Sequence, residues 1–318
     1  MLSRLRFILR RIVHTIPVLV GLTIIIFLLV RLLPGDPAIA ALGNQVTEQA
    51  VAALREQWGL DQPILMQYIL FVGRLLRGDL GYSYYYKAPV VELIAANLPL
   101  TLFLVAYAVL LTLIISVPLA MLAASRPNGI RDHLVRVVPL GGLGMPHFWI
   151  GLVLLLVFSI TLRWFPVGGA GLSVVENFRY LFLPSLTLAI GMSPILIRSL
   201  RTAMITVLSS DYVGTARTKG LSSSSIFRRH VLRNAFIPAV SVLSVNIGYL
   251  IGGSVVIKKV FAIPGLGSLM LNSIFNRDFQ MVQSITLVLA LLVVCIGIAA
   301  DIAYVALDPN VDLNRKQR

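Results

Sequence analysis

Long apolar runs separated by short polar stretches form the pattern of this sequence. The first run is Ile12–Val30, and five further runs with few charges follow it. Each has about 18 residues or more, which is enough for a helix to cross about 30 Å of hydrocarbon. The pattern predicts an all-α, polytopic membrane protein with six transmembrane helices and both termini on one side. The five later runs are Leu93–Ser125, Val137–Leu162, Tyr180–Ile197, Asn234–Ile257 and Phe279–Ala300.

Composition supports this class. Of 318 residues, 58% are apolar and only 13% are charged, too few charges to cover a soluble domain with a solvated surface. The net charge of +14 comes from cations clustered at the ends of apolar runs, a pattern typical of membrane topology rather than of nucleic-acid binding. We interpret Ile12–Val30 as an uncleaved span because of its length and because no small-residue cleavage site follows it.

The distribution of lysine and arginine predicts the orientation. Most of these residues fall at the N-terminus, in the two loops after the second and fourth runs, and at the C-terminus. The positive-inside rule places those segments in the cytoplasm, particularly since the long segment 31–92 carries little weight. We therefore expect 31–92 to be an external cap loop.

The cap loop has signals for short helices. Thr47 and Glu48 predict a helix start, and Gly59 predicts a stop after Trp58. A second amphipathic helix is expected at Tyr68–Leu76. The tyrosines of Tyr82–Tyr86 are interpreted as an interfacial belt, with a ligand-stacking surface as the alternative. A further short helix is expected outside, at Ser268–Phe275.

Proline and glycine recur inside the runs. Gly141, Gly142 and Gly144 precede Pro146 in the third run, a composition that permits kinks and close helix contacts.

One polar, basic stretch, Asp211–Pro238, lies between the fourth and fifth runs on the predicted cytoplasmic side. Gly220 and the serines that follow weaken a helix, whereas the flanking residues support one, so two short helices are predicted. The pattern indicates a docking element, and a solvated charged loop is the alternative.

Enzymatic motifs were not found. The sequence lacks His-Glu-x-x-His, Gly-x-Ser-x-Gly and the Walker Gly-x-x-x-x-Gly-Lys-Ser/Thr motif. Ionisable residues near the membrane core are confined to Asp301, Arg198 and Arg201, which we interpret as snorkelling or capping groups rather than a proton relay. A single cysteine and four histidines predict no dedicated metal site. A passage driven by a separate ATPase is favoured, with a self-sufficient carrier or channel as the alternative.

The segments Tyr212–Ser222 and Arg229–Pro238 closely resemble the coupling signature of ABC-importer permeases, in the dipeptide/oligopeptide/nickel branch. Six more segments resemble that branch in order and spacing, so the resemblance covers essentially the whole chain. They are Leu33–Pro37, Trp58–Pro63, Arg77–Ser83, Leu183–Thr187, Val260–Gly267 and Ala306–Pro309.

The resemblance implies a type I importer permease fold in the bacterial (inner) cell membrane. It implies a second homologous permease as heterodimer partner, two ABC ATPase subunits that bind ATP and Mg, and an external substrate-binding protein. This chain would then form half of the translocation pathway for di- or oligopeptides, bind no cofactor or nucleic acid itself, and catalyse no reaction. Nickel, a metal chelate or glutathione are alternative cargoes.

The expected organisation has five segments. A five-helix permease core, 93–306, contains a cytoplasmic coupling element at 211–233. The other segments are a cytoplasmic N-terminus (1–11), the first transmembrane helix (12–30), the cap loop (31–92) and a cytoplasmic C-terminal tail (307–318).

The resemblance also assigns ATPase-coupling residues. Gly214 replaces the glutamate of the general importer motif, at a position where the peptide branch more often has arginine. Small or apolar residues are expected to enter a cleft on the ATPase, and cations are expected to pair with acidic groups around that cleft. The assigned residues are Gly214, Thr215, Ala216, Arg217, Lys219, Gly220, Leu221, Arg228 and Arg229.

Candidates for lining the translocation pathway are chosen by polarity or shape alone, and core packing is the alternative for each. They are Phe148, Ser193, Asn246 and Tyr249.

Overall fold

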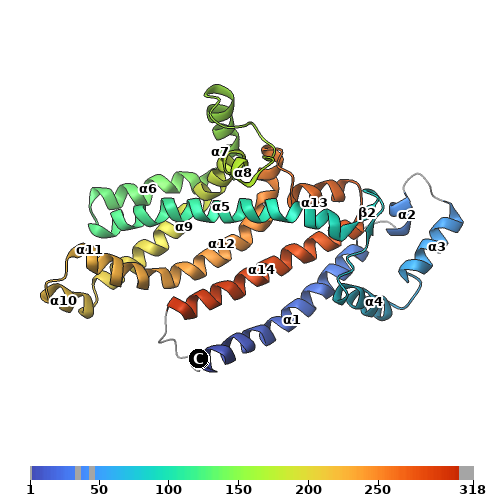
Figure 1. The fold of residues 1–318 in the computed structure, drawn as a ribbon, viewed down its shortest axis with the longest axis horizontal. Helices are drawn as coiled ribbons and strands as arrows, with labels where there is room; N and C mark the ends of the chain where they lie inside the picture. The colour runs from blue at the N-terminus through green and yellow to red at the C-terminus, as the bar shows by residue number, and fades with distance from the viewer. Residues whose placement is uncertain (1, 33–36, 43–46, 308–318) are drawn as a thin grey trace. The chain divides into compact units, whose positions relative to one another are not determined.

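The computed structural model describes residues 2–32, 37–42 and 47–307, which are mainly helical (Figure 1). They form two compact units, which are described separately. Of the described residues, unit 1 comprises 2–11, 102–263 and 295–307, and unit 2 comprises 12–32, 37–42, 47–101 and 264–294. The all-α class predicted from the sequence is confirmed.

Unit 1 is built around helix α9 (Phe182–Leu208). This helix contacts α6 (Ile130–Gly144), α7 (His147–Leu154), α8 (Val174–Tyr180) and α12 (Arg233–Val260) (Figure 1). In its most apolar 18-residue window 72% of the residues are buried, compared with 22% for the window in Ser223–Gly252. Helix α9 is therefore the core of the unit.

Close packing of α7 on α9 depends on a glycine. A Cβ atom at Gly191 would lie 2.0 Å from His147 Nε2 and 2.2 Å from its Cδ2. The imidazole therefore occupies the space that any other side chain at position 191 would need. Small residues at helix interfaces allow this kind of approach in membrane proteins.

The third predicted span is not one helix. Helix α6 ends at Gly144, α7 begins at His147, and the two axes meet at 94°. Between them Met145 is extended (φ −99°, ψ 136°), because the ring of Pro146 disfavours the helical conformation in the residue before it. The prediction of a single helix over Val137–Leu162 is wrong. Helix α7 continues into the π-helix η1 (Leu155–Thr161).

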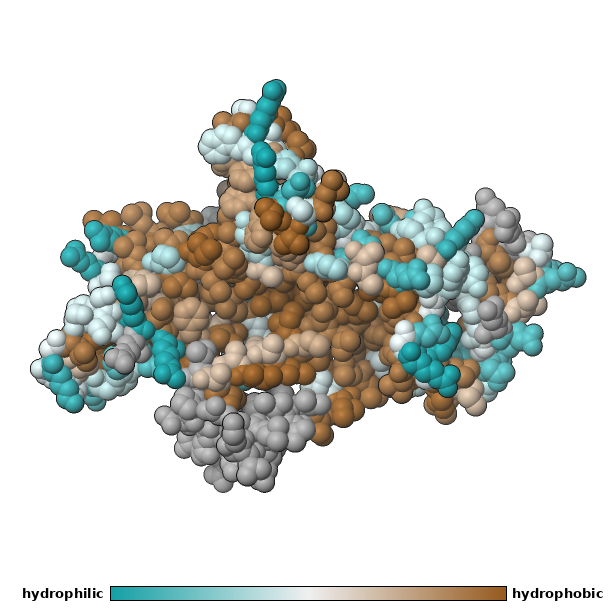
Figure 2. All heavy atoms as spheres, viewed as in Figure 1, coloured by the Kyte–Doolittle hydropathy of each residue, from teal (hydrophilic) through white to brown (hydrophobic). Residues whose placement is uncertain are grey.

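Four helices in the described part of the chain are long and apolar enough to cross a membrane, or five spans if the bent pair counts as one. They are α5 (Val90–Ser125), α9, the helical run that includes α12, and α14 (Phe279–Leu307). Helix α1 (Leu2–Leu32) covers the first predicted span, but its described apolar stretch is only Val13–Leu28. The count of six spans stays a prediction. Figure 2 shows apolar residues over the visible sides of α5 and α6, as expected of surfaces solvated by lipid.

Unit 2 contains the cap loop, and its local signals are confirmed. Helix α3 (Glu48–Trp58) begins after Thr47, whose Oγ1 accepts a hydrogen bond from Ala50 N at 3.2 Å, and it ends at Gly59 with φ 67°. Helix α4 begins earlier than predicted, directly after Pro63. The other elements are α2 (Pro37–Leu42), α4 (Ile64–Leu76), the antiparallel pair β1 (Tyr82–Ser83) and β2 (Ala88–Pro89), and α13 (Leu266–Phe275).

Candidate coupling site

Between α9 and α12 the chain forms one short separate helix, and then a helical segment that is continuous with α12. Helix α10 (Asp211–Thr218) confirms the first predicted helix. The second prediction is wrong in part, because α11 (Ser223–Ile226) is not a separate helix. It continues through the π-helix η2 (Phe227–Leu232) into α12 without a break. No breaker residue lies between α11 and α12, so the helix has no reason to stop there.

The turn after α10 is a Schellman motif. Gly220 N donates to Arg217 O at 3.0 Å, and Leu221 N donates to Ala216 O at 3.2 Å. These bonds satisfy carbonyl groups at the end of α10. They require a left-handed backbone conformation at position 220, where Gly220 has φ 80°. The turn fixes the direction in which the chain leaves α10.

The inner face of α10 packs into the core of unit 1. Val213 and Ala216 join a buried cluster that includes Met204 of α9 and Val231 of η2. Ala216 is only 7% exposed. Its position is that of a core residue, and the predicted insertion into an ATPase cleft would require it to become exposed.

Two further contacts hold α10 against the helical run that leads into α12. Asn234 Nδ2 donates a 3.0 Å hydrogen bond to the Tyr212 hydroxyl, and the Tyr212 ring lies 6.3 Å from the His230 ring between centroids. Helix α10 is therefore fixed by apolar packing on one side and by a polar bond at its start.

The outer face carries the other predicted coupling residues. Gly214 faces open space, since a Cβ atom there would meet nothing within 4 Å. The Thr215 hydroxyl donates to Asp211 O of its own helix at 3.1 Å, and Leu221 is 41% exposed. We call the exposed members of the set the coupling surface. They are Gly214, Thr215, Arg217, Lys219, Gly220, Leu221 and Arg228.

The side chain of Arg229 lies outside the described residues. Arg228 borders a shallow hollow with Ser222, Ser224 and Ser225, and the Ser222 hydroxyl accepts from Ser225 N at 3.3 Å to cap α11. The coupling surface thus presents three exposed cations on and around a hydrogen-bonded turn.

The four candidate pathway residues differ in exposure. Ser193 is 3% exposed and its hydroxyl donates to Ala189 O at 2.6 Å, while Asn246 Nδ2 donates to Val242 O at 2.7 Å. Both polar groups are thus bonded within their own helices. Phe148 on α7 and Tyr249 on α12 are 44% and 75% exposed.

Sequence reasoning missed a buried ion pair in unit 1. Arg201 of α9 donates from Nε and Nη2 to the two carboxylate oxygens of Asp132 in α6, the second bond at 2.6 Å. Asn128 N adds a bond of 2.9 Å, and Arg136 Nε lies 3.7 Å from the same carboxylate. Asp132 is fully buried, so Arg201 is a structural partner rather than a snorkelling or capping group.

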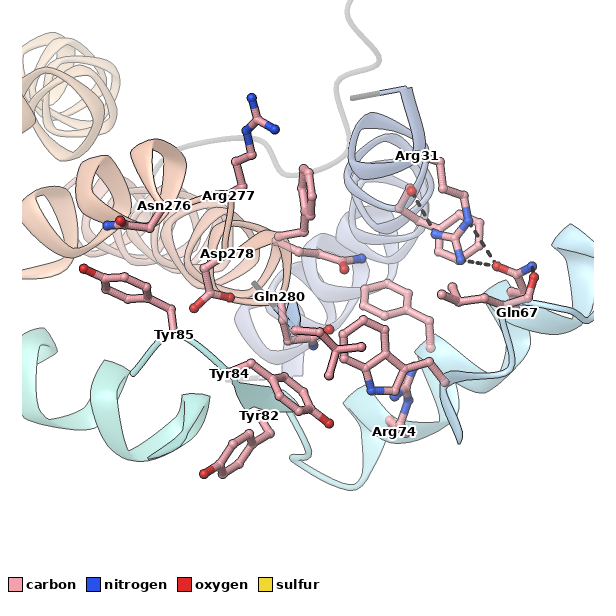
Figure 3. A pocket seen from close by; sticks show the side chains of 17 residues that line it. Arg31, Gln67, Arg74, Tyr82, Tyr84, Tyr85, Asn276, Arg277, Asp278 and Gln280 are labelled. Atoms are coloured by element: carbon pink, nitrogen blue, oxygen red, sulfur yellow. Dashed lines mark hydrogen bonds between the residues drawn. The ribbon is translucent and has the colours of Figure 1, made fainter. Parts of the chain in front are cut away.

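A cavity of about 330 Å³ lies within unit 2, with aromatic and cationic residues around it (Figure 3). Arg31 stacks on Phe27 with 3.5 Å between guanidinium carbon and ring centroid. Three tyrosines of the run line this cavity, which favours the ligand-stacking interpretation over the interfacial belt. They are Tyr82, Tyr84 and Tyr85.

Asp278, the acidic residue that lines this cavity, already accepts hydrogen bonds from other residues of the chain. The Ser83 hydroxyl donates to Asp278 Oδ2, and Met281 N donates to Oδ1 at 3.1 Å, so the carboxylate caps the start of α14. Burial raises the pKa of the nearby Tyr86 phenol, which moves its titration further from physiological pH. The available charge in the cavity is mainly that of its arginines, Arg31, Arg74 and Arg277.

Comparison with known proteins covers almost the whole chain. The family described as binding-protein-dependent transport system inner membrane component matches residues 116–313, and the N-terminal family of the same membrane component matches residues 4–105.

Two curated relatives illustrate the similarity. The oligopeptide transport system permease protein AppB of Bacillus subtilis (strain 168) is 37% identical over 312 residues, covering 96% of this chain and 99% of that protein. The glutathione transport system permease protein GsiC of Salmonella typhimurium is 36% identical over 307 residues, with 96% and 99% covered.

Among solved structures, the MetNI methionine ABC transporter in an inward-facing conformation superposes with a TM-score of 0.57. The match covers 68% of this chain and 97% of that chain at 17% identity, and it shows a shared fold. The family is a transport component of the inner membrane rather than an enzyme, in agreement with the sequence prediction. The chain belongs to the family of binding-protein-dependent transport system inner membrane components, the membrane subunits of ABC importers.

Proposed function

We propose that the chain is one of two homologous permease subunits that together form the translocation pathway of an ATP-driven importer for di- or oligopeptides. Two ABC ATPase subunits would bind the coupling surface, and an external substrate-binding protein would deliver the cargo. The observation that carries this proposal is the cationic coupling surface, exposed on a turn between the core helix α9 and the helical run that leads into α12.

The chemistry of docking follows from the exposed residues. Arg217, Lys219 and Arg228 are available for acidic groups on an ATPase, and such rim charges steer association and fix register. Leu221 supplies exposed apolar surface beside them. Ala216 would act from inside by holding α10 on the core. Arg229 is assigned by resemblance alone.

The packing of α10 also suggests how ATP hydrolysis is coupled to transport. ATP and Mg would bind to the ATPases, and their approach on ATP binding would move the coupling surface. Because α10 packs on α9 and is hydrogen-bonded to α12, that movement would be passed to two membrane helices as a shift of packed elements. No bond of the cargo is made or broken in this chain.

Peptide is the first choice of cargo because the relatives include an oligopeptide permease, and glutathione is the alternative supported by a second relative. Within the described residues no group of three or more His, Cys, Asp or Glu could hold a metal ion. Nickel or a metal chelate stays a further alternative cargo, and a chelate would need no metal ligands from the chain. Tyr249 and Phe148, both exposed on helices of unit 1, are the better pathway candidates.

The coupling assignment is tested by reversing charge on the coupling surface. In cells that also express the two ATPases, Arg217→Asp with Lys219→Asp should abolish co-purification of the ATPases while the subunit remains inserted in the membrane. The matched control is Arg163→Asp with Arg179→Asp, two exposed arginines on the predicted external side. Equal ATPase recovery from the coupling variant and the wild type would refute the assignment.

The identity of the cargo and the class of transporter need separate experiments. Mass spectrometry of ligand retained by the purified substrate-binding protein should show peptides, and glutathione or a metal chelate would identify an alternative. The chain reconstituted alone in vesicles should show no transport. Uptake without ATPases would instead indicate a self-sufficient carrier or channel.

A further inference from the structure

A second cavity of about 330 Å³ lies in unit 1 between α6 and α9. Four of its residues are basic or titratable, and the rest are apolar. The first group is His133, Arg136, Arg198 and Arg201, and the second is Val135, Val137, Pro139, Leu140, Pro194 and Ile197.

The cations of this cavity are not all neutralised. Arg201 is engaged with the buried Asp132, and Arg136 lies 3.7 Å from the same carboxylate while its side chain stays 45% exposed. Arg136 Nη2 is also 3.3 Å from His133 Nδ1. The exposed guanidinium of Arg198 makes no hydrogen bond or ion pair within the part of the chain that the structure describes. Three arginines thus line the cavity while the single carboxylate of Asp132 engages only Arg201 and Arg136, so positive charge remains in excess.

The cavity lies where the membrane helices meet their cytoplasmic ends, according to the charge pattern of the sequence. The basic residues occupy the first half of α6 and the second half of α9, and the apolar residues other than Val135 lie on the membrane side of them. Val137, Val138 and Leu140 of α6 are 53%, 69% and 43% exposed, as expected for side chains in contact with hydrocarbon. A cationic rim beside an apolar groove matches the boundary between lipid headgroups and acyl chains.

We propose that this cavity binds an anionic phospholipid of the cytoplasmic leaflet. Arg198 and Arg136 bind the headgroup phosphate, and an acyl chain lies along Val137, Leu140 and Pro194. Arginine pairs with phosphate oxygens through two parallel N–H donors, which makes it well suited to this role. The apolar lining favours a lipid over a free phosphate ion, which would gain nothing from those residues. The proposal uses the predicted orientation but does not depend on the nature of the cargo.

The proposal is tested with the protein co-purified with its partner subunits, by native mass spectrometry in detergent. Phosphatidylglycerol and phosphatidylcholine with identical acyl chains are the two probes. We expect retention of phosphatidylglycerol over phosphatidylcholine, and about 30-fold weaker retention after Arg136→Gln with Arg198→Gln. The matched control is Arg126→Gln with Arg131→Gln, which removes two exposed arginines just before and at the start of α6 that do not line the cavity.

A second variant tests the groove rather than the charge. Leu140→Trp fills the apolar part and keeps every cation, and it should also lower retention of phosphatidylglycerol. Equal retention of the two lipids, or an equal loss in the control variant, overturns the proposal. Displacement of the lipid by inorganic phosphate at equal concentration identifies a free-anion site instead. Unchanged lipid retention with lost ATPase co-purification identifies a protein contact and likewise overturns it.

Discussion

Gly214 and Gly220 belong to one short motif, but only Gly220 has a backbone conformation that favours glycine. Gly214 lies within helix α10, and a Cβ atom there would meet open space. Gly220 has φ 80° and ends the helix through the Schellman bonds. The departure from the family pattern at position 214 is therefore sterically neutral, whereas the glycine at 220 is needed by the turn.

This difference predicts opposite effects of alanine. Gly220→Ala should destabilise the turn by about 1 kcal/mol, because an L side chain is strained at positive φ, and should weaken ATPase co-purification. Gly214→Ala is the matched control and should stabilise α10 by about 0.5–1 kcal/mol through helix propensity. Thermal unfolding in detergent measures both changes. Equal destabilisation by the two substitutions would show that the turn is not the reason for Gly220.

At the residue scale, features that depend on neighbours in sequence could be predicted, whereas contacts between residues far apart in sequence could not. The Thr47 cap and the Gly59 stop of α3 depend on neighbours in sequence, so the chain itself predicts them. The partners Asp132 and Arg201 are 69 positions apart, and nothing in the sequence says that α6 packs on α9. The burial of Ala216 was missed for the same reason, because the inner face of α10 is defined only by the helices beneath it.

At the element scale, the position and identity of most helices could be predicted from apolar runs, but not the angles between them. The Gly-Met-Pro sequence before His147 indicates a weak point in the third run, and a kink and a 94° break look alike in sequence. The continuity of α11 with α12 was hidden because serines favour a loop locally, while tertiary packing supports a helix.

The contact of α7 with α9 is tested by a double-mutant cycle. Gly191→Ala should destabilise the protein, since the new methyl group would lie 2.0 Å from His147 Nε2 and the imidazole would have to leave its place between the helices. Adding His147→Ala removes the clash, so the double variant should be more stable than Gly191→Ala alone. The measurement is the midpoint of thermal unfolding in detergent. Additive losses in the double variant would contradict the packing described above.

At the scale of the whole molecule, the charge pattern makes a prediction about sidedness. In a Cys295→Ala background, Tyr85→Cys should react with a membrane-impermeant maleimide added outside bacterial spheroplasts. Ser224→Cys, on the coupling element, should react only after permeabilisation. Tyr85 and Ser224 are both exposed, so burial does not limit access of the reagent to either position. Labelling of Ser224→Cys from outside would reverse the topology and remove the basis for ATPase coupling.

The pathway was the part of the site that the sequence predicted least. Of four residues chosen by polarity or shape, Ser193 and Asn246 bond within their own helices. In the proposed assembly a second subunit supplies half of the pathway, so the surface that would line it is exposed in this chain and resembles a lipid-facing surface. Tyr249 and Phe148 could be separated from core residues only once α12 and α7 were in place.

The π-helix η2 marks where the helical run leading into α12 accommodates an additional residue. A π turn carries one residue more than the α-helix around it, so the extra residue is absorbed locally and the flanking turns keep their faces. Deleting a single residue within Phe227–Leu232 would therefore leave a regular α-helix and keep the coupling surface in its present direction. Deleting a residue from a regular part of α12 would instead rotate the turns before it by about 100° relative to the rest of the helix.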